Sequence, residues 1–569
     1  MRIVARAVPE AARERLSSAG VHPVLARVLA ARGVNDAKEL GTELRDLLAP
    51  EAMLGIDAAA RLLADTLERA QPILVVADYD CDGATACAVA VRGLRMLGAR
   101  VDYLVPNRFV HGYGLTPPIV DLAVHHPRLG RPALIVTVDN GLASLEGVER
   151  AREHGIGVLV TDHHLPAEQL PRAAAIVDPN QPGCPFPSKH LAGVGVMFYV
   201  LMALRAELRR RGAFESRQEP PLQSLLDLVA LGTVADLVRL DRNNRLLVAA
   251  GLRRIRAGRA CEGVKALFAA AGRDARQASC QDLGFSLGPR INAAGRLSDI
   301  THGIECLLAE DAARAAELAR ELDSMNRERR EIEQDMREQA LADAGEPPPH
   351  RRTLVVHREN WHEGVVGLVA SRLKERHHRP TIAFAPSAGD PQQLRGSGRS
   401  IAGVHLRDVL DLVSKRAPRM ITRFGGHAMA AGLTLPASQL AAFTEAFEQA
   451  VIDSADPACF EGELATDGAL AAAEMDLALA DLLEDLVWGQ GFAPPLFEGV
   501  FEVGAQRLLK DKHLRLELRL GGRRFGAIAF GRTEPVPRTA RIAFRLSRNE
   551  YQGLAELQLV VEAIEPPPL

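Results

Sequence analysis

Four short apolar runs between residues 73 and 178 constrain the fold of this 569-residue chain more than any other feature. Each run leads into a polar tip and then a helical pattern; the runs are Ile73–Ala77, Val101–Val105, Ala133–Val138 and Gly157–Thr161. This alternation is typical of βαβ units, whose parallel sheet is covered on both faces. The sequence therefore predicts an α/β domain. Because such sheets bind ligands at the carboxyl ends of their strands, the residues after each run are the candidates for a functional site.

Acidic residues and histidines follow three of these runs. They are Asp78, Asp80 and Asp82 after the first run, Asp139 after the third, and Asp162, His163 and His164 after the fourth; Asp236 follows a separate apolar segment. We expect the first three acids to alternate along an extended segment and share one side, with Gly83 allowing a sharp turn before a helix at Thr85–Leu97. Carboxylates so close together repel unless a cation neutralises them. Carboxylate and imidazole ligands favour Mn²⁺ or Mg²⁺, and two such ions can activate a phosphodiester for hydrolysis.

Each acidic motif also has a structural interpretation. The Asp-x-Asp-x-Asp-Gly segment could open an EF-hand loop, but the twelfth position, where such a loop needs glutamate, is Val89. Asp139 precedes Asn-Gly and could simply belong to a turn. A histidine pair is weak evidence alone, since His125–His126 and His377–His378 are also pairs, which we expect on the surface. Taken together at neighbouring strand ends, the motifs predict a metal site.

The rest of the chain predicts further domains. Residues 190–270 have a mostly helical pattern, and residues 305–344 are polar nearly all round, which favours a solvent-exposed helix between domains. A second α/β unit begins at Thr353–Val356 and continues to about residue 450. We then expect a helix at Leu470–Leu486 and the antiparallel strands of a small barrel or sandwich, at His513–Leu520, Phe525–Phe530, Ala540–Leu546 and Leu557–Val561.

Composition and charge narrow the class of protein. A net charge of −3 counts weakly against nucleic-acid binding, but residues 351–427 hold 14 Lys/Arg against 6 Asp/Glu. This excess fits either a solvated basic face or a phosphate-binding wall. The sequence has no apolar run of about 18 residues that would span a membrane, and its charged first 16 residues do not fit a secretory signal. Seven cysteines without a C-x-x-C pair indicate reduced thiols and no zinc site, so we expect a cytoplasmic protein.

The acidic motifs resemble those of the DHH phosphoesterase superfamily. Further segments resemble its RecJ family of single-strand-specific exonucleases: Asn107–Gly114, Leu191–Val196, Gly288–Arg296 and Trp361–Gly367, with Gly396–Ser400 and Gly425–Gly432 resembling the DHH-associated domain, DHHA1. The C-terminal strands resemble the OB module of that family, but only by order and pattern. The resemblance implies an N-terminal helical extension (1–60), a parallel-sheet DHH domain (61–300), a connecting helix (301–346), a smaller α/β DHHA1 domain (347–455) and an OB-like β-barrel that binds nucleic acid (456–569).

The resemblance also implies roles for individual residues around two bound Mn²⁺ or Mg²⁺ ions. The implied metal ligands are Asp80, Asp82, Asp139 (bridging), His163 and Asp236. The implied catalytic residues are His164, which would contact the substrate phosphate, Asp162, and Asp78, as a ligand or a partner of ligands. The implied substrate contacts are Asn107, Arg108, Tyr113, Arg290, Asn292, Ser397, Arg399 and His427. Structural alternatives remain for three segments: a salt bridge for Arg290, a core position for Tyr113, and tight helix packing for Ala428–Ala431.

The implied function is a 5′-to-3′ exonuclease that degrades single-stranded DNA to 5′-mononucleotides in DNA repair and recombination. The implied partners are a single-strand-binding protein and a helicase, with no membrane involved. The polarity rests on the resemblance alone. One alternative is a DHH hydrolase of short oligonucleotides or cyclic dinucleotides, against which the additional C-terminal residues argue. Another is a nucleic-acid-binding scaffold with a dead site, which would have lost metal ligands, whereas none is missing.

Overall fold

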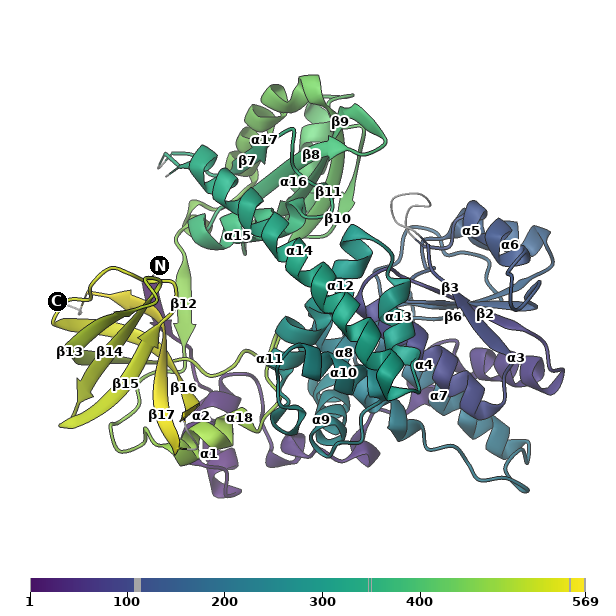
Figure 1. Cartoon of the computed structure of the whole chain (residues 1–569), viewed down its shortest axis with the longest axis horizontal. Coiled ribbons are helices and arrows are strands. Elements are labelled where there is room, and N and C mark those ends of the chain that lie inside the picture. Colours follow the sequence, from purple (N-terminus) through teal and green to yellow (C-terminus); the bar gives the residue numbers. More distant parts are fainter. Residues whose placement is uncertain (1, 107–113, 346, 349, 552–553, 567–569) are drawn as a thin grey trace. The chain divides into compact units, whose positions relative to one another are not determined.

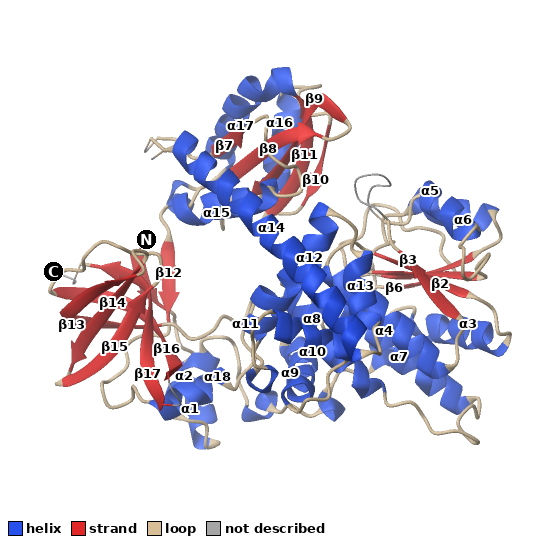
Figure 2. Cartoon of the chain, in the orientation of Figure 1, coloured by secondary structure: helices blue, strands red, loops and turns tan. Residues whose placement is uncertain are grey.

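The computed structural model describes residues 2–106, 114–345, 347–348, 350–551 and 554–566, and the chain divides into two compact units. The first unit contains Ile3–Asp323 and Ala465–Leu569, and the second consists essentially of Ser324–Leu464. The first holds a parallel sheet with its helices and a C-terminal barrel, and the second holds a smaller α/β domain (Figures 1 and 2). The predicted fold class is confirmed.

The parallel sheet has five strands in the order β3-β2-β4-β5-β6. The strands are β2 (Ile73–Ala77), β3 (Val101–Leu104), β4 (Leu134–Val138), β5 (Gly157–Thr161) and β6 (Ala175–Val177). Every residue of β2 and β4 is buried, as expected for strands covered on both faces. After β3 the chain crosses back over β2 to form β4, so the strand order reverses between β2 and β4. Open α/β sheets bind their ligands in the crevice at such a reversal.

Helices cover both faces of this sheet. On one face, α5 (Pro117–Val124) and α6 (Leu145–Glu153) pack against β2 in a shared apolar cluster. On the other lie α3 (Ile56–Glu68), α4 (Cys81–Leu97) and α7 (Gly193–Arg210). The unit also contains β1 (Arg2–Ala5), α1 (Glu10–Ser18), α2 (Pro23–Ala30), α8 (Leu226–Ala235), α9 (Arg242–Arg256), α10 (Glu262–Ala270), α11 (Cys280–Asp282), a π-helix (Leu283–Leu287), α12 (Gly288–Leu297) and α13 (Thr301–Leu308). His126, expected on the surface, is buried and accepts a hydrogen bond from the Leu129 amide at 3.2 Å.

The connecting segment differs from the prediction in two ways. It is interrupted, because α13 ends at Leu308 and α14 (Ala312–Ala344) begins after a short break. It is also not solvent-exposed all round, since Ala315, Leu318, Ala319 and Leu322 are buried. These residues recur at three- and four-residue spacing, so they form an apolar stripe that the many charged neighbours conceal in the sequence.

The second unit contains a mixed sheet in the order β10-β11-β9-β8-β7. Its elements are β7 (Leu354–His357), α15 (Val366–His377), β8 (Thr381–Ser387), β9 (Asp390–Arg399), α16 (Leu406–Arg416), β10 (Arg423–Gly426), β11 (Ala430–Pro436) and α17 (Leu440–Ser454). Phe384, Phe443 and Phe447 are buried together in its core. Tight helix packing at Ala428–Ala431 is wrong, because these residues form the turn before β11 and its first two positions.

The C-terminal strands form a closed barrel in the order β13-β14-β15-β17-β16. They are β13 (Phe497–Leu509), β14 (His513–Leu520), β15 (Arg523–Ala529), β16 (Thr539–Tyr551) and β17 (Leu554–Glu565); β12 (Glu463–Thr466) pairs with β1 outside the barrel. The helix expected at Leu470–Leu486 is shorter, since α18 spans Leu477–Glu484. Its start is set by Asp476, whose carboxylate accepts a hydrogen bond from the Leu479 amide at 2.8 Å.

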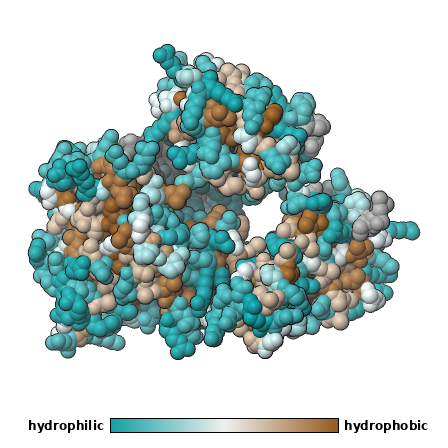
Figure 3. All heavy atoms as spheres, turned by 180° about the vertical axis from the view of Figure 1, so that it is seen from behind, coloured by the Kyte–Doolittle hydropathy of each residue, from teal (hydrophilic) through white to brown (hydrophobic). Residues whose placement is uncertain are grey.

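On the face drawn in Figure 3, hydrophobic residues are interspersed with hydrophilic ones. Among the residues that the structure describes, no helix is both long and apolar enough to cross a membrane.

Candidate metal centre and DNA contacts

Acids and histidines meet where the strand order reverses. Three groups of side chains each offer ligand atoms within 4.8 Å of one another: Asp78 with Asp80 and Asp139; Asp82 with His163 and Asp236; and Asp139 with His163 and His164. Asp139 and His163 each belong to two groups. The arrangement could hold cations at adjacent positions.

The sequence predicted that the first three acids lie along one extended segment, and the structure differs from this prediction. Helix α4 already begins at Cys81, one turn earlier than expected, and Asp80 is its N-cap, accepting a hydrogen bond from the Gly83 amide at 3.0 Å. Asp82 is therefore in the first helical turn, where the helix dipole favours negative charge. A Cβ atom at Gly83 would lie 2.6 Å from the carbonyl oxygen of Asp78. Glycine is thus required at position 83, because the backbone of Asp78 leaves no room for a side chain.

Asp82 is held by the start of a second helix. Its carboxylate oxygens accept hydrogen bonds from the amides of Gly193 at 2.6 Å and Val194 at 3.0 Å, both in the first turn of α7. These amides have no partners within their own helix, so the carboxylate satisfies them. A Cβ atom at Gly193 would lie 2.6 Å from Cβ of Asp139, and one at Gly232 of α8 would lie 2.8 Å from Oδ1 of Asp82. Two helices therefore approach the acids through glycine.

Asp139 occupies an uncommon backbone conformation. Its φ is 62°, in the left-handed region, and Gly141 follows at 114°. Between them, Asn140 donates from Nδ2 to the carbonyl oxygens of Val76 at 3.1 Å and Val138 at 2.9 Å, which ties the ends of β2 and β4 together. Such backbone conformations occur preferentially at functional sites, where surrounding contacts enforce them.

His163 faces the carboxylates. Its Nε2 lies 3.0 Å from Asp139 Oδ1, 3.6 Å from Asp236 Oδ2 and 4.0 Å from Asp82 Oδ2. Burial and the charge of His164 lower the pKa of His163 to about 4. The imidazole is therefore neutral at physiological pH, which is the form that coordinates metals.

His164 has the opposite protonation state. Its Nδ1 lies 2.7 Å from Oδ1 of Asp162, and Oδ2 of the same carboxylate accepts a hydrogen bond from the Leu142 amide at 2.9 Å. Burial alone would lower the pKa of His164, but the hydrogen bond and charge of Asp162 outweigh it and raise that pKa to about 9. His164 is therefore an imidazolium at neutral pH, oriented by Asp162.

Four acids of the centre resist ionisation together. Burial, followed by the charges of neighbouring carboxylates, raises the pKa values of Asp78, Asp82, Asp139 and Asp236, that of Asp82 to about 7. A bound cation would reverse this repulsion. Carboxylate oxygens with a neutral imidazole are ligands that suit Mn²⁺ or Mg²⁺, so the residues present fit such ions.

The predicted substrate contacts in the first unit have mixed outcomes. Asn107, Arg108 and Tyr113 lie outside the described residues. Arg290 is buried, and its Nε lies 3.0 Å from Oδ1 of Asp323, so the alternative of a salt bridge is realised. Asn292 accepts a hydrogen bond at Oδ1 from the Cys81 amide at 2.8 Å.

The predicted contacts in the second unit lie on one strand and a nearby turn. Ser397 and Arg399 are in β9, and His427 is exposed in the turn between β10 and β11. Burial lowers the pKa of Arg399. Its Nη1 donates to Gly398 O at 2.8 Å and Ser397 Oγ at 3.1 Å, and no described carboxylate forms an ion pair with it. Several other basic residues of this unit differ, because they form ion pairs with acids: Arg351 with Glu445, Arg358 with Asp343, Arg372 with Glu333 and Arg416 with Asp453.

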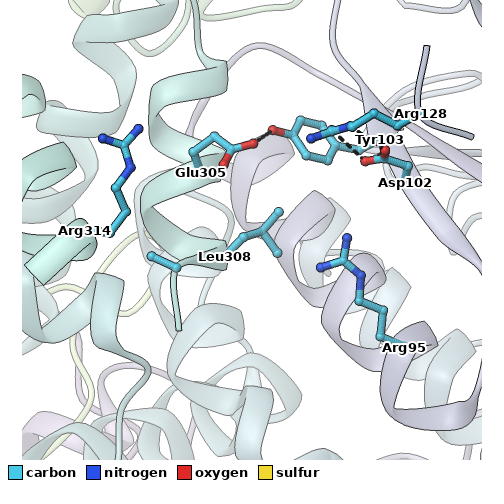
Figure 4. Close-up of a pocket in the computed structure, with 8 residues that line it drawn as sticks. Arg95, Asp102, Tyr103, Arg128, Glu305, Leu308 and Arg314 are labelled. Carbon is cyan, nitrogen blue, oxygen red and sulfur yellow. Dashed lines mark hydrogen bonds and ion pairs between the residues drawn. The ribbon is translucent and has the colours of Figure 1, made fainter. Parts of the chain in front are cut away.

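A cavity of about 330 Å³ lies elsewhere in the first unit, beside β3, α13 and the start of α14 (Figure 4). Its polar groups mostly pair with one another: the Tyr103 hydroxyl with Glu305, and Arg128 with Asp102 at 2.8 Å. Arg95, on its wall, is at the opposite end of α4 from Asp80, roughly 20 Å along the helix axis. We assign this cavity no part in the metal centre.

Sequence reasoning missed Asn180 and Asp178, which follow the short strand β6. Asn180 donates from Nδ2 to the carbonyl oxygen of His163 at 2.6 Å and so supports the histidine. Asp178 is buried, and burial followed by the charge of Asp162 raises its pKa to about 8. The signal was present, since Asp178-Pro-Asn180 follows the apolar residues Ala175–Val177 just as the other motifs follow their strands.

Comparison with known proteins agrees with this arrangement. Residues 72–233 match the DHH family, N-terminal domain, residues 351–453 match the DHHA1 domain, and residues 466–563 match the RecJ OB domain. The chain is 47% identical over 559 residues to the single-stranded-DNA-specific exonuclease RecJ of Escherichia coli strain K12, covering 96% of both proteins. It is 45% identical over 567 residues to the RecJ of Haemophilus influenzae, covering 97% of both.

Solved structures give the same result. The crystal structure of RecJ from Thermus thermophilus in complex with Mn²⁺ has a TM-score of 0.83 and 29% identity, covering 100% of this chain and 80% of that one. The corresponding Mg²⁺ complex has a TM-score of 0.78 and 28% identity, covering 100% and 78%. With nearly full-length identity to curated relatives, three matching domains and a shared fold, the chain belongs to the RecJ family.

Proposed function

We propose that this chain is a divalent-metal-dependent exonuclease that degrades single-stranded DNA from its 5′ end to 5′-mononucleotides during DNA repair and recombination. One observation carries the proposal: a neutral His163 faces a cluster of buried carboxylates where the sheet reverses its strand order. The names of the relatives support single-stranded DNA as the substrate, and the barrel matches an OB domain, a fold suited to binding single strands. The 5′ polarity, the mononucleotide product and the cellular process rest on the resemblance.

We assign the metal ligands from the geometric groups. Asp82, His163 and Asp236 would hold one ion, and Asp78 and Asp80 the other, with Asp139 between them. Bound Mn²⁺ or Mg²⁺ would polarise the phosphodiester and activate water for in-line attack. As an imidazolium, His164 donates from Nδ1 to Asp162 and carries a second proton at Nε2, which it would offer to a phosphate oxygen.

DNA contacts would come from residues of both units. A partly buried guanidinium to which the described residues offer no carboxylate partner fits a phosphate, so we propose that Arg399, with Ser397 and His427, binds the DNA backbone. Asn107, Arg108 and Tyr113 remain predicted contacts. Arg290, engaged by Asp323, would act on DNA only by exchanging that partner.

We also propose, by resemblance, that a single-strand-binding protein and a helicase are partners and that the protein works in the cytoplasm. The absence of disulfides among its seven cysteines supports a reducing compartment. Co-purification of either partner with the tagged full chain would test this part.

The central test uses DNA labelled at the 5′ or 3′ end, in several lengths, with Mn²⁺, Mg²⁺ or EDTA. We expect metal-dependent release of mononucleotides from linear single strands and 5′ overhangs, and none from a single-stranded circle. Faster digestion of 3′ than of 5′ overhangs would contradict the polarity. Activity confined to the shortest oligonucleotides or to cyclic dinucleotides would point instead to another kind of DHH hydrolase.

A further inference from the structure

Helix α12 contacts the loop that carries the first metal-ligand candidates. Oδ1 of Asn292 accepts a hydrogen bond from the Cys81 amide at 2.8 Å, and Cys81 lies between Asp80 and Asp82. Cys81 is the first residue of α4, so its amide has no partner within that helix. Because that amide is a donor, the oxygen of Asn292, and not its NH₂ group, must face it.

A second contact lies one turn further along the same helix. A Cβ atom at Gly295 would be 2.1 Å from the carbonyl oxygen of Tyr79, so the backbone of α12 rests directly on the loop. Residues three apart lie on the same face of a helix, and Asn292 and Gly295 are spaced in this way. Together they fix the loop at Tyr79 and at Cys81, on both sides of Asp80.

Helix α12 is itself anchored. Arg290 reaches Oδ1 of Asp323 on α14 at 2.8 Å through Nη2, and donates from Nη1 to the carbonyl oxygen of Ser286 at 2.6 Å. The π-helix Leu283–Leu287 runs directly into α12, and such segments are frequent at functional sites. The loop therefore contacts a fixed helix, and Asn292 gives it a side-chain hydrogen-bond acceptor from that helix.

We propose that Asn292 is a positioning residue of the metal centre: its side-chain oxygen holds the first turn of α4 so that Asp80 and Asp82 keep their ligand geometry. This rests on the proposed metal function and differs from the role in substrate binding that the resemblance implied. Hydrogen-bonding partners of metal ligands commonly contribute about 10- to 100-fold to metal affinity, which sets the expected size of the effect.

The test compares two variants of the full-length, EDTA-treated protein. Asn292→Leu keeps the volume and removes the acceptor, whereas Asn292→Asp keeps an acceptor oxygen. Mn²⁺ binding is measured by calorimetry, and affinity for a fluorescent oligodeoxythymidine by anisotropy in EDTA. We expect Asn292→Leu to weaken Mn²⁺ binding about 10-fold or more with unchanged DNA affinity, and Asn292→Asp to recover Mn²⁺ binding. Asn326→Leu, which changes a buried asparagine that contacts Arg329, should leave Mn²⁺ binding unchanged.

The outcomes separate this inference from the function on which it rests. Wild-type protein that binds no Mn²⁺ would refute the metal centre itself. If wild type and Asn292→Leu bind Mn²⁺ equally well, only the positioning role is refuted. The positioning role is also refuted if Asn292→Leu loses DNA affinity in EDTA, or if Asn292→Asp does not recover Mn²⁺ binding. If Asn292→Leu does not fold, as judged by circular dichroism, Asn292→Ala replaces it under the same criteria.

Discussion

Without metal, the carboxylate cluster should destabilise the folded protein as pH rises, and Asp82→Asn should relieve this. Burial and the charge of Asp80 raise the pKa of Asp82 from 3.8 to about 7. Between these values the unfolded chain has released the proton while the folded chain still holds it, so the folded state loses stability with rising pH and the loss is complete above pH 7. Asparagine does not titrate, so the variant lacks this loss.

The magnitude follows from the size of the shift. Each pKa unit corresponds to about 1.4 kcal/mol, and the two units between pH 5 and pH 7 give about 3 kcal/mol. The variant also loses one of the hydrogen bonds from the amides of Gly193 and Val194, because an NH₂ group cannot accept; this costs about 1–3 kcal/mol at every pH. The stability of Asp82→Asn relative to wild type should therefore improve by about 3 kcal/mol from pH 5 to pH 8.

The assay is urea unfolding in EDTA, followed by the fluorescence of Trp488 in a Trp361→Phe background, because the chain has two tryptophans and Trp488 lies in the unit that holds the acids. The control is Asp57→Asn, an exposed carboxylate in the first turn of α3, which should show no comparable pH dependence. Added Mn²⁺ should stabilise wild type far more than Asp82→Asn, since only the native ligand set binds the ion well. A difference between variant and wild type that stays flat with pH, or falls, would refute the electrostatic argument.

Three further outcomes are expected. Asp139→Asn should abolish nuclease activity in Mn²⁺. It should keep DNA affinity within a few-fold, because asparagine tolerates the left-handed backbone at this position and the fold is retained. Turnover at the wild-type rate would exclude Asp139 as a ligand. Arg399→Ala should reduce the slope of log K against log salt for single-stranded DNA by about 0.7, and an unchanged slope would make the residue purely structural. Gly232→Ala should weaken Mn²⁺ binding, because its Cβ would crowd Asp82. Gly263→Ala, whose Cβ would lie 2.1 Å from the carbonyl oxygen of Cys306, introduces a similar clash and should not weaken that binding.

Much of the fold could be predicted because buried parallel strands are short, apolar and separated by polar tips. The strands at Ile73–Ala77 and Gly157–Thr161 have the predicted bounds, and the ligand candidates follow strand ends except for Asp236, which lies at the end of helix α8. The start of α4 could not be placed in the same way. Asp80 and Asp82 read as part of an alternating acidic run, whereas in the structure one caps the helix and the other lies in its first turn. Local sequence permits both conformations, and packing against other helices selects one.

The groups that hold the acids in place could not be predicted from the sequence, because they come from distant segments. Asp82 receives its hydrogen bonds from amides more than 100 residues later, and Cys81 donates to an asparagine 211 residues later. Neither contact has a periodicity or a charge pattern that would reveal it. The resemblance identified Leu191–Val196 and Gly288–Arg296 as related to the family, but only the structure gives these segments a physical task.

That task explains why small residues surround a site built from charges. Carboxylates close enough to share cations repel one another, so the backbone that carries them needs rigid external support. Helices α7, α8 and α12 supply it by approaching within contact distance at Gly193, Gly232 and Gly295, where any side chain would collide with the acids or their loop. At this contact, α7 contributes the amides of its first turn, which donate to Asp82, and α12 contributes the side chain of Asn292. The glycines thus permit the approach and the polar groups fix its geometry, which is why the acids and the helices that hold them form one functional unit.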